Sequence, residues 1–200
     1  MRCAWFLLAL LLLSRPAAAQ DWTDAVAKAD RSLGRLLSTA PTDQTYFCTA
    51  FSIDQVRGYF LTASHCLVSR LTLDDHPAQL LFVEDGLDVA VIVADVHKPA
   101  LKAGRDVQKG QPIGAIGYGN DLSVSMFRAG VVAAPRIVLS DEIPGEWLMM
   151  NSPFVGGMSG GPVIDLHARV VSVVQRGDGT TSGVGRPIAD IVRATAKYWP

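Results

Sequence analysis

Charged residues are scarce in this sequence, and they form no block of a single sign. They make up 18% of the 200 residues, and the formal net charge is −1. Without a basic cluster the chain lacks the electrostatic signature of a nucleic-acid binder, so we expect no nucleic-acid partner. Hydrophobic residues make up 49%, which excludes global disorder and allows one compact unit or two small subdomains.

Long hydrophobic runs are also scarce, and the one long run lies at the N-terminus. Residues 4–13 are ten consecutive apolar residues, preceded by Met1-Arg2 and followed by small residues at positions 17–19. A helix needs about 20 apolar residues to span a bilayer, so a membrane anchor is the less favoured alternative. The pattern predicts a signal peptide over residues 1–19, and we expect residues 20–200 to be secreted or periplasmic and free of the membrane.

Cysteine is rare as well. The sequence has three cysteines, and Cys3 lies within the predicted signal peptide. The remaining pair, Cys48 and Cys66, is expected to form a disulfide in an oxidising compartment, with two buried free thiols as the alternative. The bridge would tie the strand after Cys48 to the turn that holds His65, and it would contribute about 3 kcal/mol by the loop-entropy argument. Two cysteines and scattered histidines lack the spacing of zinc ligands, so we expect no metal and no cofactor.

Helical patterns occur near the two ends of the mature chain, and the region between them reads as short strands. Thr23 or Asp24 would cap a short alanine-rich helix, and residues 187–197 have apolar residues at helical spacing. Between them, short apolar runs are separated by turn residues at intervals of roughly ten residues, a pattern typical of a β-barrel or β-sandwich. These runs are residues 78–83, 89–93, 113–116, 130–134, 147–150, 163–164 and 170–174.

Three short motifs carry a histidine, an aspartate and a serine, in that order along the chain. They are residues 61–66 (LTASHC), 87–92 (LDVAVI) and 157–162 (GMSGGP). A serine hydroxyl is a poor nucleophile at neutral pH and needs a neighbouring base, which in turn needs an orienting group. We therefore interpret Ser159 as the nucleophile, His65 as the general base and then acid, and Asp88 as the carboxylate that holds the imidazole.

The glycines around Ser159 predict an oxyanion hole. The backbone N–H groups of Gly157 and Ser159 could point at one carbonyl oxygen, and such a donor is typically worth about 3 kcal/mol of transition-state stabilisation. Each motif also has a structural interpretation, in which His65 is a structural histidine, Asp88 a turn residue and the glycine-rich stretch a tight turn. The three motifs together, in this order, favour catalysis.

These motifs resemble those of the trypsin/chymotrypsin-like serine proteases, especially the minimal bacterial members related to the Deg/HtrA catalytic domain. The resemblance covers about residues 32–195. It implies an all-β fold of two perpendicular six-stranded β-barrels, at about 32–105 and 110–185, followed by a C-terminal helix at about 187–197.

The same resemblance implies where the motifs lie and what they do. His65 and Asp88 would lie on the first barrel and Ser159 on the second, with the active site in the cleft between them. The implied function is that of a secreted serine endopeptidase that hydrolyses peptide bonds through an acyl-enzyme intermediate, with a polypeptide substrate as its partner.

Two departures from the resembling family bear on activation and specificity. Trypsin-type zymogens carry an aspartate immediately before the serine, where this chain has Met158, and no Ile-Val-Gly-Gly start is present. We therefore expect the oxyanion hole to form without proteolytic activation at an internal site.

Trypsin-like enzymes also place an aspartate six residues before the serine, where this chain has Pro153. We expect an apolar or small P1 residue instead of lysine or arginine, and Arg176 leaves an acidic P1 residue open. The resemblance implies four substrate-binding residues, namely Pro153, Ser172, Val173 and Val174.

Two other functions fit parts of the sequence. A catalytically silent or latent binding module would keep the fold without the activity. An α/β-hydrolase esterase would explain residues 157–161 as a nucleophile elbow, but that fold needs its acid and its histidine after the serine. Only His167 follows Ser159, so the peptidase is favoured. The sequence specifies no oligomeric state.

Overall fold

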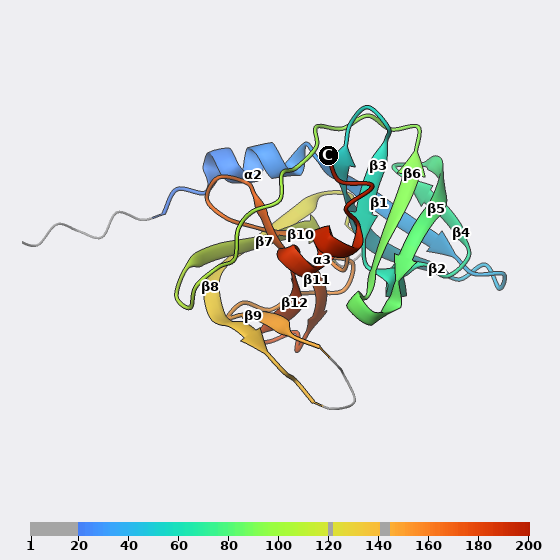
Figure 1. Cartoon of the computed structure of the whole chain (residues 1–200). Helices are drawn as coiled ribbons and strands as arrows, with labels where there is room; N and C mark the ends of the chain where they lie inside the picture. Colours follow the sequence, from blue (N-terminus) through green and yellow to red (C-terminus); the bar gives the residue numbers. More distant parts are fainter. Residues whose placement is uncertain (1–19, 120–121, 141–144) are drawn as a thin grey trace, which may run out of the picture.

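The computed structural model describes residues 20–119, 122–140 and 145–200, so the predicted signal peptide lies outside the described residues. Two closed six-stranded β-barrels make up most of this part of the chain (Figure 1). This architecture confirms the predicted chymotrypsin-like fold class. Within the described ranges, no helix is long and apolar enough to cross a membrane.

The first barrel is formed by the strands between residues 33 and 94, closed in the order β1-β2-β3-β6-β5-β4. Neighbouring strands pair antiparallel around the barrel. The strands are β1 (Leu33–Thr39), β2 (Thr45–Asp54), β3 (Tyr59–Thr62), β4 (Arg70–Leu73), β5 (His76–Glu84) and β6 (Val89–Ala94). Two short 3-10 turns, η1 (Ser64–Cys66) and η2 (Asp85–Leu87), precede β4 and β6.

The second barrel is formed by the strands between residues 112 and 187, closed in the order β10-β11-β12-β9-β8-β7. The strands are β7 (Pro112–Tyr118), β8 (Ser125–Ile137), β9 (Trp147–Met150), β10 (Pro162–Ile164), β11 (Val170–Gly177) and β12 (Gly183–Pro187). Two helices flank the barrels, α2 (Thr23–Asp30) before β1 and the predicted C-terminal helix α3 (Ile188–Ala194) after β12.

Strand β6 shows why a continuous apolar run forms a strand in this fold. Its side chains alternate between two cores: Val89 and Val91 join a cluster shared by both barrels, while Ile92 and Ala94 join the core of the first barrel. Both faces are therefore buried, and each fully buried valine or isoleucine contributes about 1.5–3 kcal/mol.

The cluster shared by the barrels also anchors both helices. Ala25 and Ala29 of α2 and Ile188 and Ile191 of α3 are buried in it. In Figure 1, α2 lies beside β7, and the chain after α3 returns to the first barrel and ends near β3. The barrels thus share one hydrophobic cluster in addition to a core of their own. The segments that carry the predicted catalytic residues lie where the barrels meet.

Candidate active site

Neighbouring strands bring His65 and Asp88 together. Strands β3 and β6 are paired with Thr62 opposite Ala90. His65 lies in η1, just after the end of β3, and Asp88 lies just before the start of β6. Asp88 adopts a left-handed backbone conformation, with a φ of 52°, which turns the chain from η2 into the strand. The two side chains therefore meet at the same edge of the first barrel.

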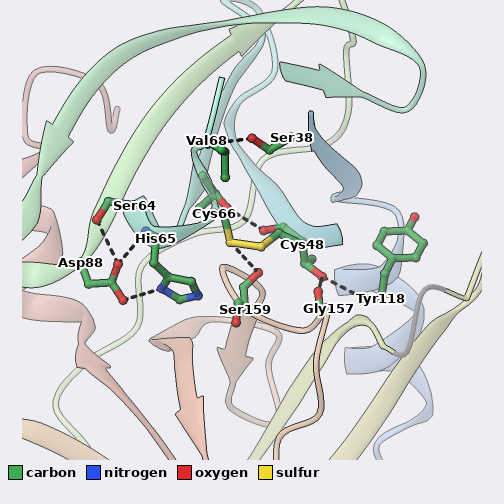
Figure 2. Close-up of a disulfide and its surroundings, with 12 residues drawn as sticks. Ser38, Cys48, Ser64, His65, Cys66, Val68, Asp88, Tyr118, Gly157 and Ser159 are labelled. Atoms are coloured by element: carbon green, nitrogen blue, oxygen red, sulfur yellow. Dashed lines mark hydrogen bonds and ion pairs between the residues drawn. A yellow bond between two sulfur atoms is a disulfide. The ribbon is translucent and has the colours of Figure 1, made fainter. Parts of the chain in front are cut away.

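The carboxylate of Asp88 accepts three hydrogen bonds from the η1 turn (Figure 2). Its Oδ2 lies 2.8 Å from Nδ1 of His65. Its Oδ1 accepts the backbone N–H of His65 and the hydroxyl of Ser64, both at 2.9 Å. Because both oxygens are engaged, the carboxylate fixes the orientation of the imidazole and favours the tautomer with a proton on Nδ1.

The same contacts set the protonation of Asp88. Burial by itself raises the pKa of this carboxyl, but the hydrogen bond and the charge of His65 lower it, with further help from the His65 backbone N–H and the Ser64 hydroxyl. The net effect lowers the pKa of Asp88 below its ordinary value. Asp88 is therefore an anion at neutral pH and stabilises a positive charge on His65.

Side chains from the second barrel hold the turn that precedes β6. Gln175 at the end of β11 donates through Nε2 to the carbonyl oxygens of Leu87 and Asp88, at 2.6 and 2.8 Å. Arg186 of β12 donates to the carbonyl oxygen of Gly86 at 2.9 Å. Both side chains are 4% exposed. Sequence analysis missed these two residues, and the only signal was a polar residue within otherwise apolar or glycine-rich strands.

Ser159 lies in the turn before β10 and faces His65 from the second barrel. In Figure 2 the imidazole points from Asp88 toward Ser159. Two adjoining cavities, one bordered by Ser159 and one by His65, share Gln175 and Arg176 in their linings. Among the described residues, no hydrogen bond joins the Ser159 hydroxyl to His65. Nucleophile–base contacts are often longer in free enzymes and shorten when substrate binds.

The backbone around Ser159 leaves two N–H groups available. Met158, Gly160 and Gly161 donate their N–H groups to carbonyl oxygens of the protein. The N–H groups of Gly157 and Ser159 have no acceptor anywhere in the described part of the chain. Gly157 has a φ of 90° and Gly160 a φ of 82°, in the left-handed region that glycine tolerates best. The turn thus has the donors that an oxyanion hole requires.

A cavity of about 390 Å³ opens beside Ser159. Phe154 borders one side of it: its ring packs directly on Gly183, and its backbone and Cβ lie against Gly177. At Gly183 a Cβ atom would lie only 2.5 Å from that ring. The cavity is lined by Phe154, Val155, Gly156, Ser159, Val174, Gln175, Arg176 and Gly177.

The predicted substrate-binding residues only partly coincide with this lining. Val174 borders the cavity, whereas Ser172 and Val173 are fully buried and Pro153 does not line it. The Ser172 hydroxyl donates to the carbonyl oxygen of Arg186, which ties β11 to β12. On β11 the cavity wall runs from Val174 to Gly177, and the strand becomes exposed only at Arg176.

The disulfide predicted between Cys48 and Cys66 is present and buried. It joins β2 to η1, and the Cys66 sulfur lies 3.8 Å from the carbonyl oxygen of Ser159. Cys48, His65 and Cys66 are the one cluster of potential metal ligands among the described residues. Both cysteine sulfurs are consumed by the disulfide and are not thiolates, so this set does not suit a metal ion.

A double β-barrel with a His–Asp pair facing a serine turn defines the class of chymotrypsin-like serine peptidases. The family model of the trypsin-like peptidase domain matches residues 48–173, more than half of the chain, and the chain therefore belongs to this family. No curated protein sequence matches the chain closely enough to count as a relative.

Solved structures with the same fold include two proteases at low sequence identity. The Rv3671c protease from M. tuberculosis, in its active form, is 21% identical with a TM-score of 0.76, covering 86% of this chain and 83% of that chain. The HtrA-type protease AlgW with a tripeptide is also 21% identical with a TM-score of 0.76, covering 89% of this chain but only 64% of that one. AlgW with a decapeptide gives 17% identity and a TM-score of 0.74.

Proposed function

We propose that this protein is a serine endopeptidase that uses Ser159, His65 and Asp88 as its catalytic triad. The observation that carries the proposal is the Asp88–His65 contact of 2.8 Å, which faces a serine turn with two available N–H groups. Membership of the trypsin-like peptidase family supports the same reaction class. AlgW is seen with a tripeptide and with a decapeptide, which supports a polypeptide substrate here.

The proposed reaction follows from these groups. His65 takes the proton of the Ser159 hydroxyl as the oxygen attacks the scissile carbonyl, and Asp88 stabilises the imidazolium. The N–H groups of Gly157 and Ser159 donate hydrogen bonds to the negatively charged tetrahedral oxygen and stabilise it. His65 then returns the proton to the leaving amine, and an acyl-enzyme remains. A water molecule, deprotonated by His65, hydrolyses this ester and restores the Ser159 hydroxyl.

The oxyanion turn is proposed to be active without internal cleavage. Met158, which occupies the position of the aspartate of trypsin-type zymogens, is fully buried in the apolar core of the second barrel. A buried thioether offers no partner for a newly formed N-terminal amine. The turn already has the two free donors, so no rearrangement is required to create them. The mature domain is proposed to start near residue 20 and to be secreted or periplasmic, as the N-terminal sequence predicts.

The cavity beside Ser159 favours a small or apolar P1 residue. Phe154 occupies the space between Gly177 and Gly183, and Val155 and Val174 add apolar surface to the cavity lining. Arg176 is the only charged residue among the described residues that line the cavity, and it is exposed. It would select for an acidic group in the peptide near the scissile bond. Profiling on a peptide library tests this proposal, and a strong preference for lysine or arginine at P1 would overturn it.

The first test of the function is labelling of the purified mature chain with a fluorophosphonate. We expect labelling of the native protein, because the reagent needs both an activated serine and an oxyanion hole. Ser159→Ala and heat-denatured protein are the controls, and both should remain unlabelled. Folded, disulfide-bonded protein that fails to react would favour the alternative function, a silent or latent protease-fold binding module.

A further inference from the structure

Thr49 of β2 is a fully buried residue that reaches from the first barrel into the second. Its hydroxyl donates to the carbonyl oxygen of Gly157 and accepts the backbone N–H of Tyr118, both at 2.9 Å. Its backbone N–H donates to the carbonyl oxygen of Ser159 at 2.9 Å. Its own carbonyl oxygen accepts the Thr62 hydroxyl at 2.8 Å. All polar groups of Thr49 are thus engaged, and three of the four bonds cross to the second barrel.

These bonds hold alternate peptide units of the oxyanion turn. The carbonyl of Gly157 belongs to the peptide unit that carries the Met158 N–H, and the carbonyl of Ser159 belongs to the unit that carries the Gly160 N–H. Between these two units lies the one that carries the N–H of Ser159. Because a peptide unit is planar, fixing the units on both sides limits the rotation of the unit between them. Thr49 therefore orients the donor without contacting the reacting atoms.

The second barrel is shaped to receive Thr49 at close range. A Cβ atom at Gly160 would lie 2.3 Å from the Thr49 carbonyl oxygen, and one at Gly117 would lie 2.7 Å from its hydroxyl. A Cβ atom at Gly161 would lie 3.3 Å from the Thr49 methyl group. Three glycines thus surround one threonine, so its position is fixed by shape as well as by hydrogen bonds.

We propose that the Thr49 side chain is a positioning residue that holds the oxyanion turn in its active conformation. The inference rests on the proposed serine peptidase function. Met158 provides no charged group to hold this turn from within the second barrel. The Thr49 hydroxyl anchors the turn from the first barrel instead, and it does so in the uncleaved chain.

The test compares Thr49→Val with Thr49→Ser in the full mature protein, using a fluorophosphonate as the probe. Valine keeps the shape and removes the hydroxyl, whereas serine keeps the hydroxyl. Because small displacements of catalytic donors are costly, we expect Thr49→Val to lower the maximal inactivation rate about tenfold to a hundredfold. The reagent concentration for half-maximal rate should stay unchanged, and so should the pH midpoint of labelling. Thr49→Ser should restore most of the rate.

Thr195→Val is the matched control. Thr195 is fully buried, and its hydroxyl donates to the carbonyl oxygen of Ile191 at 2.8 Å in the C-terminal helix, away from the site. It should lower the unfolding temperature without changing the labelling rate. If Thr49→Val fails to fold, Thr49→Ala makes the same comparison with less crowding.

Three results would overturn the proposal. The first is a hydroxyl-free variant that labels at the wild-type rate, and the second is a Thr49→Ser variant as slow as the valine variant. The third is a Thr195→Val control whose labelling rate falls as much as that of Thr49→Val for the same loss of unfolding temperature. An unlabelled wild-type protein would instead remove the proposed function itself, and the inference with it.

Discussion

At the scale of single residues, the arrangement of donors around Asp88 decides how the imidazole is held. The carboxylate accepts one bond from the ring of His65, one from its backbone and one from Ser64. The ring and the backbone of the same residue are therefore bound by one group. These two hydrogen bonds fix both the position of η1 and the tautomer of the ring, because a change in either would break a hydrogen bond to a charged acceptor.

Replacing Asp88 with asparagine should abolish most of the activity while preserving the fold. The amide has the size of the carboxylate but carries a donor group toward His65, which favours the wrong tautomer. We expect the labelling rate with a fluorophosphonate to fall about 10³- to 10⁴-fold. Circular dichroism should show an unchanged fold, and a variant that keeps more than a tenth of the wild-type rate would exclude the proposed role.

The stability of the wild-type protein should depend on the ionisation of Asp88 in acid. The folded protein lowers the pKa of this carboxyl, so the folded state binds its proton less readily than the unfolded state does. The resulting stabilisation is fully present above the unfolded pKa of about 3.9 and is lost as pH falls through the folded pKa. Thermal unfolding between about pH 6 and pH 2 should show a steeper loss for the wild type than for Asp88→Asn. Parallel curves would contradict this assignment.

At the scale of secondary-structure elements, the apolar pattern predicted the short strands but not the point at which β11 becomes exposed beside the cavity. Residues 170–174 read as one apolar run, and the strand is buried over that run. The antiparallel register between β11 and β12 shifts between Val174 and Arg176. An irregularity of this kind depends on the partner strand, so periodicity within one segment does not reveal where the strand leaves the core.

Two side chains that bind backbone of the other barrel were not predicted from the sequence either. Thr49 binds the carbonyl oxygen of Gly157, 108 residues away, and Gln175 binds that of Leu87, 88 residues away. Each is a polar residue in a strand, and strands commonly carry such residues on solvated faces. By contrast, the histidine, aspartate and serine motifs are local, because each combines the functional side chain with the flanking residues that shape its turn.

The disulfide links β2 to η1, and its removal should affect both stability and the site. Cys48 and Cys66 are 18 residues apart. Loss of the bridge should lower the free energy of unfolding by about 3 kcal/mol by the loop-entropy argument. The labelling rate should also fall, because η1 carries His65 and the cysteine before Thr49 loses its anchor. Cys48→Ala/Cys66→Ala compared with the wild type, with and without reductant, measures both effects. An unchanged rate in folded, bridge-free protein would show that η1 is held by Asp88 alone.

At the scale of the whole molecule, the C-terminal segment returns from the second barrel to the first. The ring of Tyr198 contacts Tyr59 and Phe82, with centroid distances of 5.8 and 5.7 Å. Its hydroxyl donates to the carbonyl oxygen of Leu81, and Arg57 donates to its carbonyl oxygen, both at 3.2 Å. The segment thus joins strands β3 and β5 to the helix that packs on the second barrel.

Replacing Tyr198 with alanine should weaken the association of the two barrels. Two aromatic contacts are each worth about 0.5–1.5 kcal/mol beyond their buried area, so we expect a loss of about 2 kcal/mol in the free energy of unfolding. Tyr46→Ala is the matched control, since Tyr46 is 41% exposed and has no ring contact among the described residues. Chemical denaturation measures the difference. Equal denaturation midpoints for the two variants would show that the contacts of Tyr198 do not stabilise the association of the barrels.

The division of the catalytic groups between the barrels has a consequence for biosynthesis. The first barrel supplies the imidazole and its carboxylate, and the second supplies the proposed nucleophile and the amide of Gln175, which binds the turn at Asp88. A ribosome releases these halves one after the other. If the proposed function holds, the nascent first half carries a base without a nucleophile, and hydrolysis would begin only after the second half is translated and docked. The order of synthesis would thus delay the proposed activity until both barrels have been made.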